Sequence, residues 1–343
     1  MSTLPKHTTL PTVIAGYSGG LDSTLAARLM VTLGFRVIAV QFTSPFLGWS
    51  KYGEAVRLNQ FRRAEALGVE LRQIDVTAEH LAMVKSPKFG YGSNVNPCID
   101  CKFLFWEKLS EIMRAEGAVG IVTGDVLGQR PMTQTRHQIE RLEKLTGLAG
   151  KIIRPLCGRL LPPTDAEQQG YYTHEQLYAF NGRSRKPQIK LAEELGITEY
   201  PTPAGGCSLT VPQSAERIKQ LLENNWEAFT PENIRLLTVG RHFLLGEGRL
   251  VVARNSEECD VLKAQRQADD AFLSLEGGIG TLAIFRGAVT EESRQLAVDI
   301  VGYFSPKSRN AGYGVYCDEG DERTLLRPQA IEAAKVQALM LIT

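Results

Sequence analysis

The feature that most constrains the fold is a short glycine motif near the start of the chain, Ser18-Gly19-Gly20-Leu21-Asp22-Ser23. An apolar run at residues 12–17 precedes this motif, and an apolar helical pattern at residues 25–30 follows it. That order predicts a strand, a tight glycine turn and the start of a helix. Because free backbone N–H groups and the helix dipole attract anions, such a turn is suited to binding phosphate.

The side chains of the glycine motif refine this prediction. The hydroxyl groups of Ser18 and Ser23 can donate hydrogen bonds to phosphate oxygens. Asp22 would repel phosphate unless a cation lies between them, so we expect Asp22 to hold Mg²⁺. Gly19 and Gly20 let the backbone pass close to a bulky anion. The simpler alternative is an ordinary strand-to-helix turn that is capped by serine.

Strand-like and helix-like segments alternate through the first half of the chain. The apolar runs lie at residues 12–17, 35–42, 69–76, 119–124 and 151–156, with helical patterns between them. This alternation predicts an α/β fold with a doubly wound parallel sheet. Ligands of such sheets bind beyond the carboxyl ends of the strands. We expect the glycine motif to share that edge with Phe42 and Ser44, after the second strand, and with Gly124 and Asp125, after the fourth.

The character of the sequence changes toward the C-terminus. Short β-like pieces appear at residues 241–245, 249–254 and 281–285, separated by glycine-containing turns. We therefore expect a first domain over residues 1–228 and a smaller α+β domain over residues 229–343. In the second domain, Arg241, His242, Phe243, Arg249 and Arg254 combine positive charge with a stackable ring, which suits RNA. A solvated face of a small β domain is the alternative.

Composition limits the class of protein. The chain has 343 residues, 43% of them hydrophobic and 22% charged, with a net charge of +1. No overall field attracts nucleic acid, so RNA would have to be bound by local patches. No apolar run is long enough to span a bilayer, and the N-terminal residues are polar. We expect a cytoplasmic protein without membrane contact, whose six cysteines stay reduced.

Three cysteines have the spacing and context of a functional set. Cys98 and Cys101 follow an irregular segment, residues 85–97, and open a helical pattern at residues 102–114. A helix N-terminus predicts a lowered thiol pKa for such a pair. Cys207 follows Gly205 and Gly206 on a second loop. Three thiolates could hold a 4Fe–4S cluster with one open site, or could pass a persulfide sulfur without a metal. An incomplete zinc site or simple packing is the structural alternative.

The glycine motif resembles the SGGxDS signature of the PP-loop ATP-pyrophosphatase family, whose members split ATP into AMP and pyrophosphate. This resemblance implies an adenine nucleotide alpha hydrolase-like domain with ATP and Mg²⁺ as cofactors. Asn96-Pro97 followed by Cys98 to Cys101 is similar to a segment of the tRNA 2-thiouridylases. The stretch at residues 123–129, TGDVLGQ, with Gln134 and Thr135 after it, is similar to a segment of the tRNA 4-thiouridine synthases.

These resemblances imply a thiolation reaction. ATP adenylates a uridine carbonyl oxygen with loss of pyrophosphate, and sulfur then displaces AMP. The glycine motif would hold the pyrophosphate end of ATP, while Gly124, Asp125 and Gln129 would line the active edge. Asp125 is expected to hold Mg²⁺ or to orient the base, with an N-cap for the following helix as the alternative. Cys98, Cys101 and Cys207 would carry the sulfur chemistry.

The implied partners are tRNA or another RNA and a sulfur donor, either a persulfide protein or inorganic sulfide; an oligomer is left open. Residues 240–243 and 251–258 also faintly resemble the RNA-binding domain of the NFACT family. Two other functions remain as alternatives. One is a PP-loop ligase or sulfur-insertion enzyme that acts on a small molecule. The other is a non-enzymatic RNA-binding protein regulated by ATP.

Overall fold

The structure is a computed structural model that describes residues 10–47, 53–200, 207–223, 227–278 and 280–341. The chain divides into two compact units, Met1–Cys207 and Ser208–Thr343. This division comes before helix α8 (Pro212–Glu223), whereas the sequence-based boundary at 228/229 comes after it. None of the helices in the described ranges is long and apolar enough to cross a membrane.

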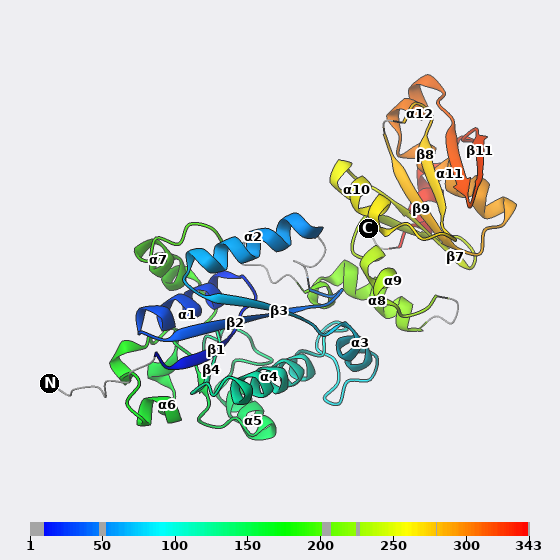
Figure 1. The fold of residues 1–343 in the computed structure, drawn as a ribbon. Helices are drawn as coiled ribbons and strands as arrows, with labels where there is room; N and C mark the ends of the chain where they lie inside the picture. The colour runs from blue at the N-terminus through cyan, green and yellow to red at the C-terminus, as the bar shows by residue number, and fades with distance from the viewer. Residues whose placement is uncertain (1–9, 48–52, 201–206, 224–226, 279, 342–343) are drawn as a thin grey trace. The chain divides into compact units, whose positions relative to one another are not determined.

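The first unit contains a parallel sheet of five strands in the order β3-β2-β1-β4-β5 (Figure 1). The expected α/β class is confirmed. Its strands are β1 (Thr12–Gly16), β2 (Arg36–Thr43), β3 (Glu70–Asp75), β4 (Ile121–Val122) and β5 (Ile152–Ile153). Its α-helices are α1 (Leu21–Thr32), α2 (Gly53–Ala66), α3 (Thr77–Lys85), α4 (Cys98–Ala115), α5 (Arg136–Thr146), α6 (Asp165–Gln168) and α7 (Lys186–Glu194). Short 3₁₀ turns lie at Gly158–Leu160 and His174–Gln176.

Side chains alternate between the two faces of the sheet along each strand of the first unit, so the sheet has one hydrophobic core on each face. Val13 and Ala15 of β1 pack with Met30 of α1, whereas Ile14 packs with Trp106 of α4. Successive strand residues point to opposite faces, so near-continuous apolar strands supply both cores. Helices α1 and α2 cover one face, and α4 and α5 cover the other (Figure 1).

The order of the strands places the ligand-binding edge of the first unit. The chain runs outward from β1 to β2 and β3, and then returns to add β4 on the other side of β1. The loops that follow β1 and β4 therefore separate at a topological switch point, where parallel sheets bind ligands. The glycine motif follows β1, and Gly124 and Asp125 follow β4.

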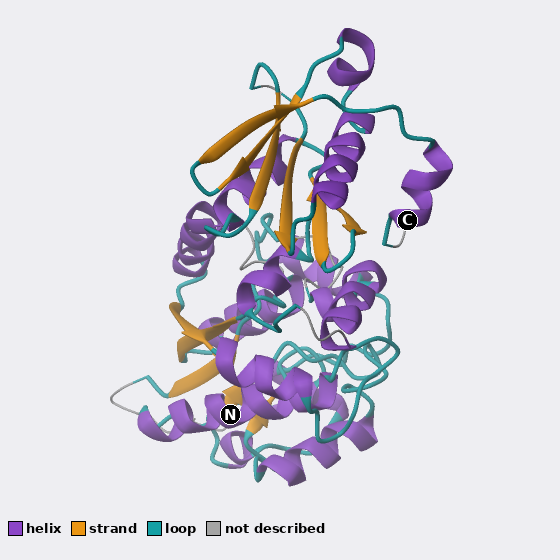
Figure 2. Cartoon of the chain, turned by 90° about the vertical axis from the view of Figure 1, so that its right-hand side faces the viewer, coloured by secondary structure: helices purple, strands orange, loops and turns teal. Residues whose placement is uncertain are grey.

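The second unit contains an antiparallel sheet of six strands in the order β11-β10-β8-β9-β7-β6 (Figure 2). Its strands are β6 (Arg241–Leu244), β7 (Gly248–Val252), β8 (Ala271–Leu275), β9 (Leu282–Gly287), β10 (Val315–Glu319) and β11 (Glu322–Leu326). Its helices are α8, α9 (Pro231–Leu236), α10 (Ser256–Gln265), α11 (Glu291–Tyr303), α12 (Pro306–Ala311) and α13 (Ala333–Leu339), with a 3₁₀ turn at Ser208–Thr210. One face of the sheet packs on α11, and the other packs on α9 and α10.

Candidate functional site

The glycine motif forms a tight turn into α1. Gly19 has a φ of +73°, and a Cβ atom there would lie 2.5 Å from Oε1 of Gln60. Gly20 is the N-cap of α1 and makes no side-chain cap hydrogen bond. The hydroxyl oxygens of Ser18 and Ser23 lie 3.1 Å apart. The motif thus places two hydroxyl groups beside the exposed start of a helix dipole, which is the arrangement predicted for phosphate binding.

Asp22 lies in the first turn of α1 with one oxygen held and one without a partner. Gln129 donates from Nε2 to Oδ2 of Asp22 at 2.8 Å, and Arg185 lies 3.5 Å from the same oxygen. Gln188 in turn donates to Oε1 of Gln129 at 3.0 Å. Oδ1 of Asp22 is buried and accepts no hydrogen bond from the described part of the chain. A carboxylate oxygen in this state fits a Mg²⁺ ligand.

Gly124 allows β4 to approach the start of α1. A Cβ atom on Gly124 would lie 2.6 Å from the backbone carbon of Asp22 and 2.6 Å from the backbone nitrogen of Ser23. Backbone atoms cannot move aside as a flexible side chain can, so the position requires glycine. The segment after β4 and the glycine motif after β1 are therefore in direct contact, as their common sheet edge predicts.

Asp125 lies in a buried network of charges and hydrogen bonds. Its carboxylate accepts from Lys102 Nζ at 2.6 and 2.7 Å, from Thr123 Oγ1 at 3.1 Å and from Gln134 Nε2 at 2.9 Å. Arg154 Nε lies 3.6 Å from Oδ2. Burial acts to raise the pKa of Asp125, but the positive charges of Lys102 and Arg154 outweigh it and hold that pKa well below its usual range.

This network revises the expected roles of Asp125. The alternative of an N-cap is wrong, because α5 begins at Arg136 and is capped by Thr135. A direct role in holding Mg²⁺ stays a prediction, and the contacts of Asp125 are those of a residue that positions Lys102. Lys102 immediately follows Cys101 on α4, so the ion pair ties the start of that helix to the end of β4.

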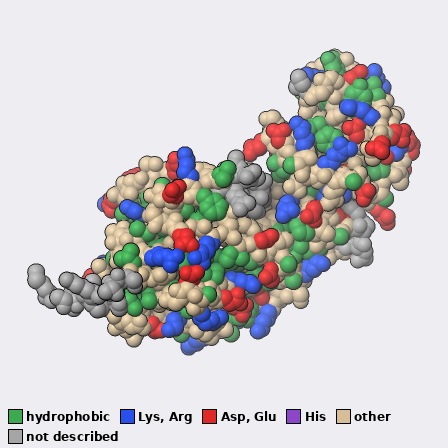
Figure 3. Space-filling view, viewed as in Figure 1, with side chains coloured by type: hydrophobic (Ala, Val, Ile, Leu, Met, Phe, Trp, Pro, Cys, Tyr) green, Lys and Arg blue, Asp and Glu red, His purple; other side chains and the backbone are tan. Residues whose placement is uncertain are grey.

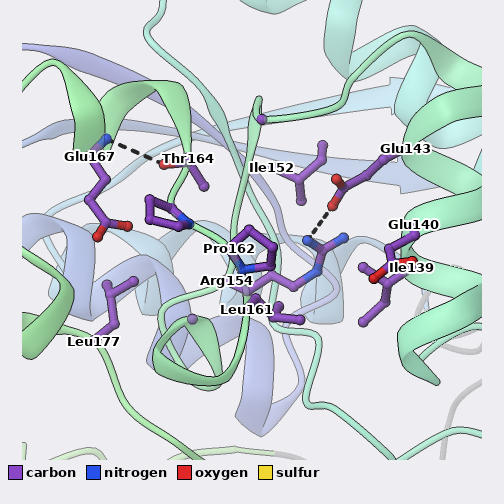
Figure 4. Close-up of a pocket in the computed structure, with 13 residues that line it drawn as sticks. Ile139, Glu140, Glu143, Ile152, Arg154, Leu161, Pro162, Thr164, Glu167 and Leu177 are labelled. Carbon is purple, nitrogen blue, oxygen red and sulfur yellow. Dashed lines mark hydrogen bonds and ion pairs between the residues drawn. The ribbon is translucent and has the colours of Figure 1, made fainter.

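Arg154 extends the network to a small cleft of about 90 Å³ in the same unit (Figure 4). Its NH1 group donates to Oε1 of Glu143 at 2.5 Å. The two side chains face each other beside Ile139 and Ile152, and Pro162 and Leu177 lie across the cleft. The residues that line the cleft include none of the site residues predicted from the sequence. The cleft surrounds the ion pair of Arg154 and Glu143.

Cys98, Cys101 and Cys207 converge in the structure. Cys98 and Cys101 lie in the first turn of α4, after Pro97 as N-cap, and Nδ2 of Asn96 donates to Sγ of Cys98 at 3.1 Å. Cys207 forms an antiparallel bridge with Leu47, in the segment after β2. Gly205 and Gly206, which precede Cys207, lie outside the described residues. The three thiols are close enough that Cys207 and Cys98 each affect the ionisation of Cys101.

The expected lowering of the thiol pKa is wrong for Cys101. Burial raises the pKa of Cys101 well above its ordinary value, and the neighbouring Cys207 and Cys98 thiols raise it further. Desolvation disfavours the thiolate more strongly than the helix N-terminus favours it. Among the described residues, no three Cys, His, Asp or Glu side chains are spaced to hold a single metal ion.

His80 contacts this cysteine set, although the sequence does not single it out. Its Nε2 atom lies 3.3 Å from Sγ of Cys101, and its Nδ1 atom lies 2.8 Å from Oγ of Ser44. Burial lowers the pKa of His80 to about 4, so the ring is neutral near pH 7. When Ser44 donates to Nδ1, the proton of His80 lies on Nε2 and is donated to the sulfur of Cys101.

Ser44 and Phe42 were predicted to line an ATP site, and this stays a prediction. Ser44 Oγ contacts His80 and also accepts from the backbone N–H of Phe46 at 3.3 Å. Phe42 is buried and stacks on Phe105 with ring centroids 4.7 Å apart. A contact of Phe42 with a nucleotide would therefore come from its backbone. No sequence signal marked Lys102, His80 or Gln188, whose roles depend on partners far along the chain.

Two family models match the chain. Residues 8–160 match "Thiamine biosynthesis protein (ThiI)", and residues 240–339 match "NFACT protein RNA binding domain". The first of these matches lies within the first unit, which is therefore similar to the ThiI family over those residues. Both resemblances seen in the sequence are thereby confirmed: the PP-loop thiolation branch for the first unit and an NFACT-type domain for the second.

Curated relatives of the chain are named for tRNA sulfur chemistry. A probable tRNA sulfurtransferase of Thermococcus kodakarensis is 34% identical over 148 residues, which are 43% of this chain and 37% of the relative. The tRNA-specific 2-thiouridylase MnmA of Syntrophotalea carbinolica is 32% identical over 123 residues, which are 33% of this chain and 34% of the relative. The chain thus spans little more than a third of the length of these relatives.

A solved structure of a 4-thiouridine synthetase–RNA complex with bound ATP is also similar to this chain. The two are 20% identical in sequence, with a TM-score of 0.41, over 66% of this chain and 51% of the other. In the second unit, the expected stacking of RNA bases on His242 and Phe243 is wrong, because both rings are fully buried. On the face that Figure 3 presents, positive and negative side chains are interspersed, so no single-sign field covers it.

Proposed function

We propose that this chain is an ATP-dependent RNA sulfurtransferase that thiolates a uridine of tRNA. The observation that carries the proposal is the meeting of two sets of residues at one sheet edge. The glycine motif and Gly124 are in direct contact there, and Asp125 binds Lys102, the neighbour of Cys101. The segment after β4 therefore links the residues that would bind phosphate to the residues that would carry sulfur. The names of the curated relatives, which are tRNA sulfurtransferases and a tRNA 2-thiouridylase, support this choice of reaction.

In the first step, the carbonyl oxygen of the uridine attacks the α-phosphorus of ATP. A new P–O bond forms, the bond to the β-phosphate breaks, and pyrophosphate leaves. Ser18, Ser23 and the backbone N–H groups at the start of α1 would stabilise the departing pyrophosphate. Asp22, through its unpartnered Oδ1, would hold the Mg²⁺ that neutralises it. The product is an adenylated uridine. Its carbonyl oxygen, which by itself is a poor leaving group, can now leave the carbon as part of AMP.

In the second step, a sulfur nucleophile adds to the activated carbon and AMP leaves. In one route, Cys98, Cys101 and Cys207 would each bind one iron of a 4Fe–4S cluster. Such a 4Fe–4S cluster, when bound, would supply an open iron site at which sulfide from the donor is held. His80 would orient Cys101 and donate to its sulfur, which favours the deprotonated form that a ligand needs.

The metal-free alternative also has an observation in its favour. Burial keeps Cys101 protonated, as suits a resting thiol rather than a ligand. In that route one cysteine carries a persulfide whose terminal sulfur attacks the activated carbon. A second cysteine then attacks the inner sulfur, which forms a disulfide and releases the thiolated base. A thiol reductant must reduce this disulfide before the next turnover.

The decisive test separates adenylation from sulfur transfer. In Cys207→Ala, RNA-dependent release of pyrophosphate should persist, whereas formation of thiouridine should fall to background. Cys259→Ala is the matched control, because Cys259 lies in the second unit, where its thiol contacts the carbonyl oxygen of Gly280. Thiolation that survives Cys207→Ala would remove Cys207 from the reaction. Absence of any ATP cleavage in the wild-type protein with tRNA would remove the proposed function.

Iron and acid-labile sulfide, measured after anaerobic purification, separate the two sulfur routes. The cluster route predicts both, with a visible absorption band that Cys98→Ala, Cys101→Ala and Cys207→Ala each weaken. A colourless, iron-free protein that thiolates tRNA at the full rate would exclude the cluster and leave the persulfide route.

A further inference from the structure

The second unit buries two guanidinium groups that are not fully paired. Arg249 on β7 is 0% exposed and Arg217 on α8 is 6% exposed. Glu227 accepts from Nε and NH2 of Arg249, at 3.0 and 2.8 Å, which leaves NH1 without a partner. Arg217 donates from NH1 to the carbonyl oxygen of Leu237 at 3.1 Å, and its Nε has no partner in the described part of the chain.

Backbone geometry brings these two arginines to one place. His242 donates from Nε2 to the carbonyl oxygen of Val239 at 2.7 Å, so Arg217 and His242 are anchored to the same turn at residues 237–239. In the β6–β7 pairing, His242 is opposite Val251 and Leu244 is opposite Arg249. His242 and Arg249 therefore lie on one face of the sheet, the face that packs on α9 and α10.

The charges in this cluster do not balance. Arg217, Arg249 and Arg254 are faced by two carboxylates: Glu227, which binds Arg249, and Glu258, whose Oε1 lies 2.9 Å from Nε of Arg254. Among the described residues, no carboxylate lies within ion-pair distance of Arg217. Burial, then Arg254 and then Arg249 lower the pKa of Arg217 to about 10, which shows that like charges have been brought together.

The cluster also reaches the surface of the unit. The side chain of Arg254 is 45% exposed. The positive charges thus run from fully buried Arg249 through Arg217 to exposed Arg254. The surface end of this run, at Arg254, is where an anion would approach the buried guanidinium groups.

We propose that Arg217 and Arg249 form a binding site for an oxyanion of the phosphate class. Unpartnered N–H groups of buried guanidinium are rare in native proteins, and the planar fork of donors matches phosphate geometry. A buried water could accept these hydrogen bonds, but it would leave the excess charge uncompensated. Nδ1 of His242, which also lacks a partner, carries a lone pair that a protonated oxygen or a ribose hydroxyl would satisfy.

A backbone phosphate of RNA is the source that we favour, and this choice rests on the proposed function. His242, Arg249 and Arg254 lie within residues 240–339, which match an RNA-binding domain. A phosphodiester with its neighbouring ribose offers both the acceptor oxygens and the hydroxyl group that the cluster lacks. Free inorganic phosphate offers the same chemistry, so the experiment needs an arm for each source.

The first arm measures the melting temperature of the full chain in phosphate and in chloride at constant ionic strength. At about ten times its Kd, phosphate should raise the wild-type Tm by about 3 °C. Arg217→Met should lose this rise, and without phosphate it should melt no lower than wild type, because an uncompensated charge has gone. Arg235→Met, which removes an exposed arginine from α9 in the same unit, should keep the full rise.

The second arm measures tRNA binding as a function of salt concentration. Arg217→Met should reduce the slope of log Kd against log salt by about one phosphate contact, whereas Arg235→Met should leave it unchanged. Arg217→Lys, which keeps the charge without the fork, should retain the slope but bind more weakly.

The outcomes separate the claims. If phosphate fails to raise the wild-type Tm, or raises that of Arg217→Met equally, the oxyanion site is wrong. If the rise depends on Arg217 but the tRNA slope does not, the site takes free phosphate rather than RNA. If wild type binds no tRNA yet shows the phosphate effect, the proposed function fails and the oxyanion site stands.

Discussion

The sheet edge of the first unit and the arginine cluster of the second unit both bury charged groups, and they differ in how far neighbouring carboxylates neutralise the buried arginines. At the edge, Nε and NH2 of Arg154 have no hydrogen-bond partner, but Asp125 and Glu143 lie within ion-pair distance of this guanidinium and neutralise its charge. Beside them, Oδ1 of Asp22 is an unpaired acceptor. In the arginine cluster, the unpaired atoms of the guanidinium groups are donors.

This difference is the basis for proposing a different ligand for each unit. An unpaired buried acceptor is satisfied by a cation, and unpaired buried donors with excess positive charge are satisfied by an anion. The pair of Lys102 and Asp125 shows, in the same protein, two buried charges that neutralise each other. Functional charge is recognised by what its surroundings fail to neutralise, rather than by burial alone.

The largest expected effect comes from removing the unpaired acceptor. Asp22→Asn should lower RNA-dependent release of pyrophosphate by about 10²–10³-fold or more, because the carboxylate that would hold Mg²⁺ is lost. Unfolding in urea should change by no more than about 1 kcal/mol, the size of a charge interaction with a helix N-terminus. Undiminished pyrophosphate release would contradict the assignment of Asp22 and of the PP-loop site.

The next effect tests the balanced network. Asp125→Ala leaves Lys102 and Arg154 buried without this carboxylate, so the free energy of unfolding should fall by about 3–5 kcal/mol. Asp165→Ala is the control, because the Lys151–Asp165 pair has a similar N–O distance, 2.6 Å, but is much more exposed. It should cost about 0–1 kcal/mol in the same urea titration. Equal losses in both variants would mean that burial does not distinguish the two pairs.

The smallest effect concerns the pH dependence of the arginine cluster. Burial, with the charges of Arg217, Arg249 and Arg254, lowers the pKa of His242 well below 6.5. The unfolded chain therefore takes up the proton first, and stability that is complete above pH 6.5 is lost as the pH falls. His242 should contribute a slope of up to about 1.4 kcal/mol per pH unit below that value.

His242→Gln, which keeps an N–H donor for Val239, should remove this contribution. The measurement is the free energy of unfolding of both proteins in urea, at steps from pH 7 downward. The difference between them should appear only below about pH 6.5. Parallel curves over the whole range would show that His242 takes up its proton equally in the folded and unfolded states.

Much of the first unit could be predicted from the sequence. The apolar runs at residues 12–17, 35–42 and 69–76 correspond to β1, β2 and β3, and the runs at 119–124 and 151–156 contain the shorter β4 and β5. In the second unit, the pieces at 241–245, 249–254 and 281–285 correspond to β6, β7 and β9. Most residues of strand β11 are exposed and two are charged, so the sequence there lacks the alternation of apolar and polar residues that predicts a strand.

The residues of the candidate site also fall into those that the sequence predicts and those that it does not. The glycine motif and the pair of Cys98 and Cys101 are local patterns, so their spacing alone indicates phosphate and sulfur chemistry. Gln188 reaches Gln129 across 59 residues, and His80 reaches Cys101 across 21. No local pattern marks such partners, because packing rather than spacing brings them together.

By itself, the sequence determined the strand–turn–helix at Ser18 to Ser23, the parallel sheet and the set of cysteines. Only the tertiary structure decided which charged groups are neutralised. It paired Asp125 with Lys102, raised the pKa of Cys101, and left Asp22 and Arg217 with unpartnered atoms. The reason is physical: backbone preferences act between neighbours in sequence, whereas desolvation and Coulomb interactions depend on distances that only folding sets.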